Sequence, residues 1–223
     1  MNTKVLGWLA LITLLFSGLW LAMLIASLAT AGPLDTFEQV LGYVSAGGPL
    51  YTLTYLNAAL VTVAATAFFA ALYRFVNRST PLGSLVGLMF LPAYAVINLF
   101  VYLSQITIVP RLISTLTHPD RAPAAALLLE QMVQAWTESG AAFFNNLAYG
   151  LLGIPSILFG MVLWRSSRTL RWGGLLLVLN GIACIVGVVG MLAGSRFLAG
   201  GSVVGGVLFI IALPLIAAGM LRE

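Results

Sequence analysis

The side chains that could take part in chemistry begin with a polar stripe inside an apolar stretch, residues 91–110. Tyr94, Asn98, Tyr102 and Gln105 stand at positions i, i+4, i+8 and i+11, which places them on one face of a helix. Amides and phenols donate and accept hydrogen bonds, so the stripe can either bind a ligand or join helices. An unpaired amide in hydrocarbon is costly, so Asn98 must face protein or a cavity.

Other polar residues fall near the same ends of neighbouring apolar stretches. Asn145 and Tyr149 share a helix face with Glu138, provided that the helix starts before Gly140. We expect these groups to converge on an outward-opening pocket with Glu138 at its rim. The predicted ligand-binding residues are Asn57, Tyr94, Asn98, Tyr102, Gln105, Glu138, Asn145, Asn146 and Tyr149. The alternative is that the amides and tyrosines join helices, at about 0.6 kcal/mol for each hydrogen bond.

Composition identifies the chain as an integral membrane protein. Of its 223 residues 61% are hydrophobic and 7% are charged, whereas soluble domains have about 25% charged residues. The net charge of +4 comes from residues between apolar runs, which indicates membrane orientation and not nucleic-acid binding. A single cysteine, Cys184, and a single histidine, His118, predict no disulfide, no metal site and no bis-histidine haem. We expect no cofactor.

Hydropathy predicts one all-α transmembrane domain over residues 1–223, with two interfacial amphipathic helices on the outer side. One of these helices starts at Asp35, which caps it and has the spacing of a capping box with Glu38. The other lies between Arg111 and Gly140, with Leu129, Met132, Val133 and Trp136 on its apolar side, resting on the membrane or on the bundle. Six spans are predicted, at about 5–30, 51–73, 82–109, 141–164, 172–195 and 197–221.

The distribution of basic residues predicts the orientation. With six spans, seven of the ten basic residues fall on the side of the two termini, and Arg111, Arg121 and Arg196 fall on the other side. Because Lys and Arg collect on the cytoplasmic side, we expect both termini in the cytoplasm and the protein in the cytoplasmic membrane.

The sequence lacks residues that several classes of membrane protein need for their function. No Lys, Arg, Asp or Glu lies deep in a span, whereas proton relays, ion-coupled carriers and voltage sensors usually have one. An enzyme would have to use Glu130 or Glu138 at the outer interface, and the sequence favours a solvated helix face for both. Glycine pairs such as Gly190/Gly194 and Gly201/Gly205 indicate close helix packing. The same glycine-rich helix faces are also candidate contacts between two copies of the chain in a homo-oligomer.

A wider resemblance rests on motifs in the second, fourth and fifth spans. Phe69-Ala-Ala-Leu-Tyr-Arg-Phe75, Leu147-Ala-Tyr-Gly150 followed by Pro155, and Gly173-Gly-Leu-Leu-Leu-Val-Leu-Asn-Gly181 resemble a bacterial family of six-span membrane proteins that is catalogued as a domain of unknown function. The resemblance implies a bacterial cytoplasmic membrane and no particular activity. A histidine often precedes the fourth-span Tyr-Gly in that family, and 144–150 contains none here.

The sequence therefore favours a multi-pass membrane protein that binds a small lipophilic molecule or a membrane lipid. Two alternatives stay open: an outer-leaflet lipid-modifying enzyme that uses Glu138, and a packing or regulatory subunit that meets its partner through a glycine-rich face of the fifth and sixth spans. The sequence favours a protein that is not an enzyme, and it identifies neither ligand nor partner.

Overall fold

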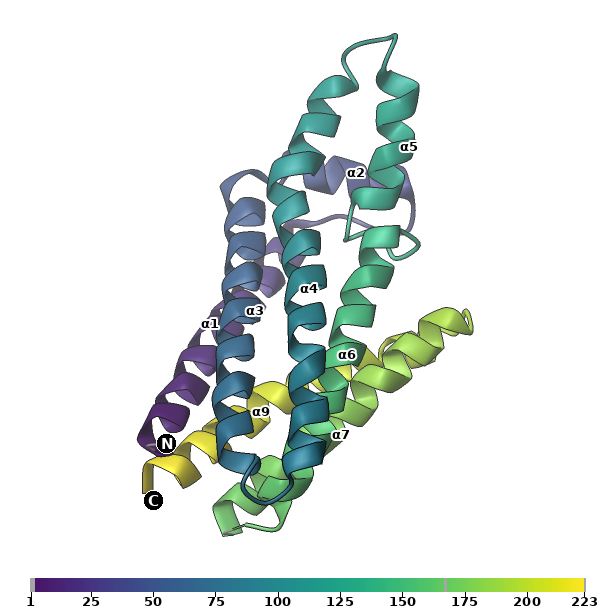
Figure 1. Cartoon of the computed structure of the whole chain (residues 1–223). Helices are drawn as coiled ribbons and strands as arrows, with labels where there is room; N and C mark the ends of the chain where they lie inside the picture. The colour runs from purple at the N-terminus through teal and green to yellow at the C-terminus, as the bar shows by residue number, and fades with distance from the viewer. Residues whose placement is uncertain (1–2, 167, 223) are drawn as a thin grey trace.

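The computed structural model describes residues 3–166 and 168–222, which form helices joined by turns (Figure 1). Within these residues, six helices are long and apolar enough to cross a membrane, so the chain is an all-α polytopic membrane protein. The spans are α1 (Thr3–Thr30), α3 (Gly48–Val76), α4 (Pro81–Thr115), α6 (Gly140–Trp164), α7 (Arg168–Leu192) and α9 (Gly201–Arg222). The shorter helices are α2 (Phe37–Ala46), α5 (Ala122–Met132) and α8 (Arg196–Ala199).

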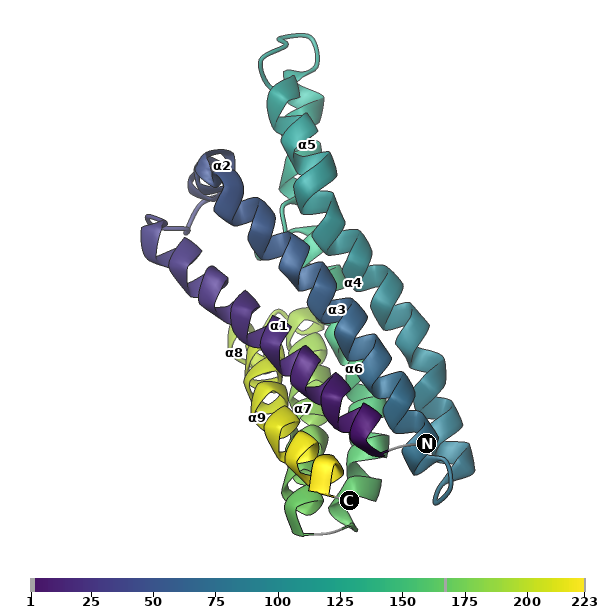
Figure 2. The ribbon, with the colours of Figure 1, turned by 90° about the vertical axis from the view of Figure 1, so that its left-hand side faces the viewer.

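The six spans form a closed ring in chain order. Each span packs against the span before it and the span after it, and α9 closes the ring by packing against α1. Because the number of spans is even, both termini lie at one end of the ring, which we call the terminal end (Figures 1 and 2). The other end, which carries α2 and α5, is the distal end.

The third span is longer than predicted. The sequence predicted that Pro110 ends this span, yet α4 continues to Thr115. The reason is that Leu112 and Ile113 pack against a hydrophobic cluster at the distal end, which includes Val40, Val109 and Leu129. The end of α4 and the antiparallel α5 form a hairpin that projects from the distal end (Figure 1). The expected amphipathic helix therefore rests on the bundle, where Leu129 is fully buried.

Two local predictions differ from the structure. Helix α5 ends at Met132, so Trp136 lies in the following turn, with its ring centroid 6.0 Å from that of Phe37. The capping box of α2 uses Thr36 and Gln39 and not Asp35 and Glu38. The reason is that Gln39 accepts hydrogen bonds from the backbone N–H groups of both Asp35 and Thr36, which a helix starting one residue earlier would not allow.

Glycines bring α6, α7 and α9 into backbone contact. A Cβ atom added to Gly153 would lie 2.7 Å from the carbonyl oxygen of Gly181, and one added to Gly160 would lie 2.8 Å from that of Gly174. Gly187 and Gly201 approach each other in the same way between α7 and α9. The glycine-rich faces are therefore used inside the chain, as expected for small residues at membrane helix interfaces.

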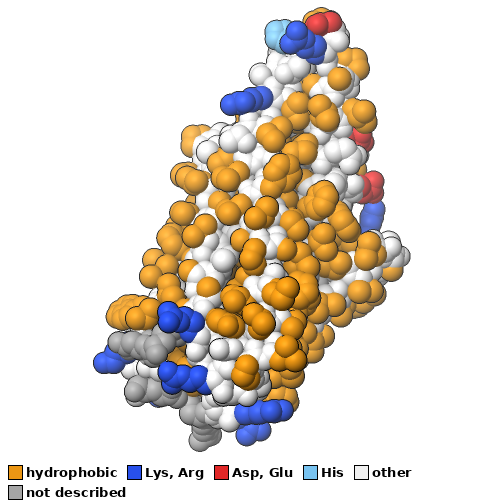
Figure 3. All heavy atoms as spheres, in the orientation of Figure 1, with side chains coloured by type: hydrophobic (Ala, Val, Ile, Leu, Met, Phe, Trp, Pro, Cys, Tyr) orange, Lys and Arg blue, Asp and Glu red, His pale blue; other side chains and the backbone are white. Residues whose placement is uncertain are grey.

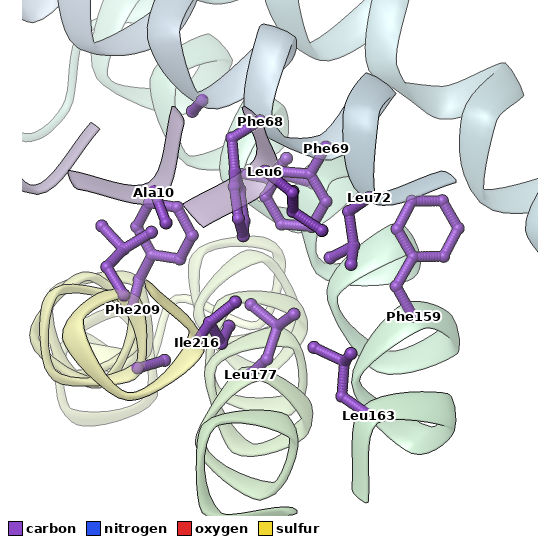
Figure 4. Close-up of a cluster of buried hydrophobic side chains, with 14 of the residues drawn as sticks. Leu6, Ala10, Phe68, Phe69, Leu72, Phe159, Leu163, Leu177, Phe209 and Ile216 are labelled. Atoms are coloured by element: carbon purple, nitrogen blue, oxygen red, sulfur yellow. The ribbon is translucent and has the colours of Figure 1, made fainter. Parts of the chain in front are cut away.

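An aromatic cluster fills the ring toward the terminal end. Phe68 and Phe69 of α3 meet Phe209 of α9, and the Phe69 and Phe209 rings are stacked with centroids 5.9 Å apart. Side chains from α1, α6 and α7 complete the cluster (Figure 4). This half of the ring is closely packed.

The surface agrees with a membrane setting. Hydrophobic side chains cover the middle of the molecule, while Lys and Arg gather at the terminal end and charged residues mark the tip of the α4–α5 hairpin (Figure 3). Large exposed apolar side chains such as Leu15, Val96 and Ile211 belong to this belt, which lipid would cover.

The glycine contacts predict that two Gly→Ala substitutions have different effects on the free energy of unfolding. Gly153→Ala should lower the free energy of unfolding by about 1–3 kcal/mol, because the new methyl group would press on the Gly181 carbonyl. Gly206→Ala should be neutral or stabilising by up to about 1 kcal/mol, since its Cβ would meet nothing within 4 Å. Thermal unfolding in detergent measures both, and equal Tm values for the two variants would contradict the close approach.

Candidate functional site

The predicted polar residues of α4 and α6 meet in one hydrogen-bonded cluster. Asn98 donates from Nδ2 to Thr62 Oγ1 at 3.3 Å, and its Oδ1 accepts from Asn145 Nδ2 at 2.9 Å. The same Asn145 nitrogen lies 3.0 Å from the Tyr102 hydroxyl, which lies 2.7 Å from the Tyr149 hydroxyl. The cluster therefore joins α3, α4 and α6 through side chains alone.

Gln105 fixes the turn between α5 and α6 onto this cluster. Its Oε1 accepts from the backbone N–H of Gln134 at 3.0 Å and from the Tyr51 hydroxyl at 3.2 Å. Its Nε2 donates to the Met132 carbonyl at 2.8 Å. The turn contributes Gln134, whose side chain accepts from the Tyr55 hydroxyl and lies 3.5 Å from Asn145.

These residues converge, but they bond to one another. Asn98 and Gln105 are fully buried, and Asn145 is 8% exposed. The part of the predicted pocket around these three amides is thus occupied by the paired side chains themselves. Here the amides join helices, as the alternative interpretation of these residues predicted.

Three other predicted residues lie apart from the cluster. Asn57 donates to the Phe16 carbonyl at 2.8 Å and so ties α3 to α1. Asn146 donates to the Ala142 carbonyl of its own helix at 3.0 Å. Glu138 is exposed in the turn before α6.

A cavity of about 50 Å³ lies beside the cluster, at the centre of the ring. Tyr94, Tyr102 and Tyr149 line it on the side of α4 and α6, and Phe209 belongs both to its lining and to the aromatic cluster. Every span contributes to the lining, which comprises Ser17, Trp20, Ala58, Val61, Ala65, Tyr94, Tyr102, Tyr149, Leu152, Asn180, Gly206, Phe209 and Ile210.

Two polar atoms in this lining lack a partner in the protein. In the part of the chain that the structure describes, three buried side-chain oxygens have no hydrogen bond: Ser17 Oγ, Asn180 Oδ1 and Ser202 Oγ. Ser17 and Asn180 are each 3% exposed and line the cavity, whereas Ser202 lies at the glycine contact between α7 and α9. An unpaired polar group inside a membrane protein is unfavourable, so the Ser17 and Asn180 oxygens, on residues of the lining, would each be stabilised by a hydrogen-bond partner.

Sequence reasoning did not select these residues. Asn180 is visible as an amide within an apolar run, but Ser17 gives no signal, because most serines in spans bond to their own helix, as Ser156 bonds to the Leu152 carbonyl. Tyr51, Tyr55 and Gln134 were also missed. The spacing of Tyr51 and Tyr55, four residues apart before Thr62, could have indicated a second polar face.

No protein-family model, curated protein or solved structure matches this chain. The resemblance to a six-span bacterial family therefore stays a prediction, and the function is argued from the site.

The polar cluster predicts different costs for two substitutions of Asn98. Asn98→Leu removes the bonds to Thr62 and Asn145 and should lower the free energy of unfolding by no more than about 2 kcal/mol. Asn98→Asp should cost about 3–5 kcal/mol at neutral pH, because it buries a charge without a basic partner. Unfolding in detergent micelles measures both. If the Asp variant were as stable as the native protein, water would have to reach the cluster.

A neighbouring asparagine supplies the control. Asn146 is half-buried and bonds to its own helix, so Asn146→Leu should change the free energy of unfolding by less than about 1 kcal/mol. A cost equal to that of Asn98→Leu would show that the bonds between helices add nothing.

Proposed function

We propose that this membrane protein binds a small lipophilic molecule, or the polar end of a membrane lipid, in the cavity at the centre of its six spans. The observation that carries the proposal is the pairing of an apolar, tyrosine-rich lining with the unpartnered Ser17 and Asn180 oxygens. Ligand sites are mostly apolar concavities in which a few polar groups fix the ligand's orientation.

The cavity volume limits what enters it. A water molecule needs about 10–15 Å³ by this measure, so about 50 Å³ holds roughly three to five water-sized groups. A whole phospholipid does not fit in that space. The end of a lipophilic molecule does, and the rest of such a ligand would lie along the helices in the membrane.

The route to the cavity is indicated by the exposure of its lining. Trp20 of α1, Val61 of α3 and Gly206 and Ile210 of α9 are half-buried, whereas Tyr94 and Tyr102 are buried. The lining therefore approaches the surface near α1, α3 and α9, within the apolar belt. If the termini are cytoplasmic, as the basic residues predict, the polar cluster beside the cavity lies toward the outer leaflet.

No specific observation favours either of the two alternative functions. Glu138, the acid on which the enzyme hypothesis rests, is exposed in a turn and is not part of the cavity lining. The subunit hypothesis relied on glycine-rich faces of α7 and α9, and Gly187, Gly190 and Gly201 contact neighbouring helices of the same chain.

A cavity-filling substitution tests the proposal. Gly206→Leu places a side chain at the lining where a Cβ meets nothing within 4 Å, so it should exclude a ligand without breaking a packed contact. Mass spectrometry of compounds that copurify in mild detergent should show a lipophilic compound with the native protein. Its amount should fall about tenfold or more in the Gly206→Leu variant.

Gly18→Leu is the matched control. Gly18 is exposed on α1, its Cβ also meets nothing within 4 Å, and it is not part of the lining. This variant should carry as much of the compound as the native protein. Equal amounts in all three proteins would place the compound outside the cavity and contradict the proposal.

A further inference from the structure

We infer that the ligand of the central cavity presents a hydrogen-bond donor to Asn180, and that the chemical class which fits is a lipophilic alcohol or phenol. This inference rests on the proposed function and adds to it the polarity of the group that enters the cavity.

The orientation of the Asn180 amide is determined by its partner on α9. Its Nδ2 lies 2.9 Å from the Gly205 carbonyl oxygen. A carbonyl oxygen can only accept a hydrogen bond, so the nitrogen end of the amide must face Gly205. The same nitrogen lies 3.6 Å from Cys184 Sγ. The oxygen end, Oδ1, is therefore the group left unpaired.

An amide oxygen only accepts hydrogen bonds, and this one is buried in the cavity lining without a partner. A ligand that satisfies Asn180 must therefore donate. Ethers, ketones and quinones have oxygens that only accept, and hydrocarbons offer neither function. Each of these would leave the buried Oδ1 unpaired, which is unfavourable.

Ser17 of α1 extends the same argument to a second residue of the lining, on a helix that α9 separates from α7. Its hydroxyl lies on α1, is 3% exposed and has no partner in the protein. A hydroxyl both donates and accepts, so Ser17 can accept from or donate to a ligand. A ligand hydroxyl, which also has both functions, is the smallest group on a lipophilic molecule that can satisfy either residue. Within about 50 Å³ it leaves room for a few carbon atoms behind it.

Two isomers of the same formula test the requirement for a donor. Octan-1-ol and heptyl methyl ether have the same atoms, but only the alcohol donates a hydrogen bond. The purified full chain in detergent would be titrated with each compound, its partition into micelles being measured separately, and the rise in Tm would give each Kd. We expect the alcohol to bind about tenfold more tightly.

The possible outcomes separate the inference from the proposed function. Equal affinities that are both abolished by Gly206→Leu would overturn the donor requirement and leave ligand binding in the cavity intact. If neither compound raises Tm, the proposed function fails and the inference fails with it.

Variants of the two polar residues complete the test. Asn180→Leu should reduce the preference for the alcohol from about tenfold to about one. If that variant does not fold, Ser17→Ala should still reduce the preference severalfold. Ser156→Ala, at a fully buried serine outside the cavity lining whose hydroxyl bonds to its own helix, should leave the preference unchanged. A full preference retained in Ser17→Ala, and in Asn180→Leu where it folds, would overturn the assignment.

Discussion

The structure depends on one constraint: a polar group inside a membrane has to find its hydrogen-bond partner within the protein or in a ligand. The amides of Asn98, Gln105 and Asn145 meet this constraint through neighbouring helices and the turn before α6. Because most of their bonds cross from one element to another, satisfying them fixes how α3, α4 and α6 pack. The Ser17 and Asn180 oxygens do not meet it within the protein, and the ligand site that we propose lies beside these two residues.

Two kinds of packing explain why the cavity lies where it does. The polar cluster holds α3, α4 and α6 together, while glycine contacts hold α7 against α6 and α9 against α7. Helix α1 bridges these two groups, bonded to α3 through Asn57 and packed against α9. The aromatic cluster fills the terminal end of the ring, and the cavity is the space left between that cluster and Tyr94, Tyr102 and Tyr149.

Much of the architecture could be predicted from the sequence, because span length and apolar content depend on local composition. The stripe from Tyr94 to Gln105 is also buried on one face, as its spacing predicted. The partners could not be predicted, because they depend on which helices become neighbours. Asn57 bonds to a backbone carbonyl on α1, which has no sequence signature. Tyr94, Tyr102 and Tyr149, which the sequence predicted as pocket residues, line the cavity. Its position could not be predicted, because most of its lining is apolar and because Ser17 becomes informative only once its missing partner is known.

The most direct test of the central claim is an experimental structure of the protein, crystallised from a lipid mesophase after purification in mild detergent. We expect non-protein density in the cavity beside Tyr102 and Tyr149, with an atom at hydrogen-bond distance from Asn180 Oδ1. The contradicting result would be a cavity closed by protein side chains, with Asn180 Oδ1 and Ser17 Oγ each bonded to a protein group. In that case the centre of the ring would be a packed core and not a binding site.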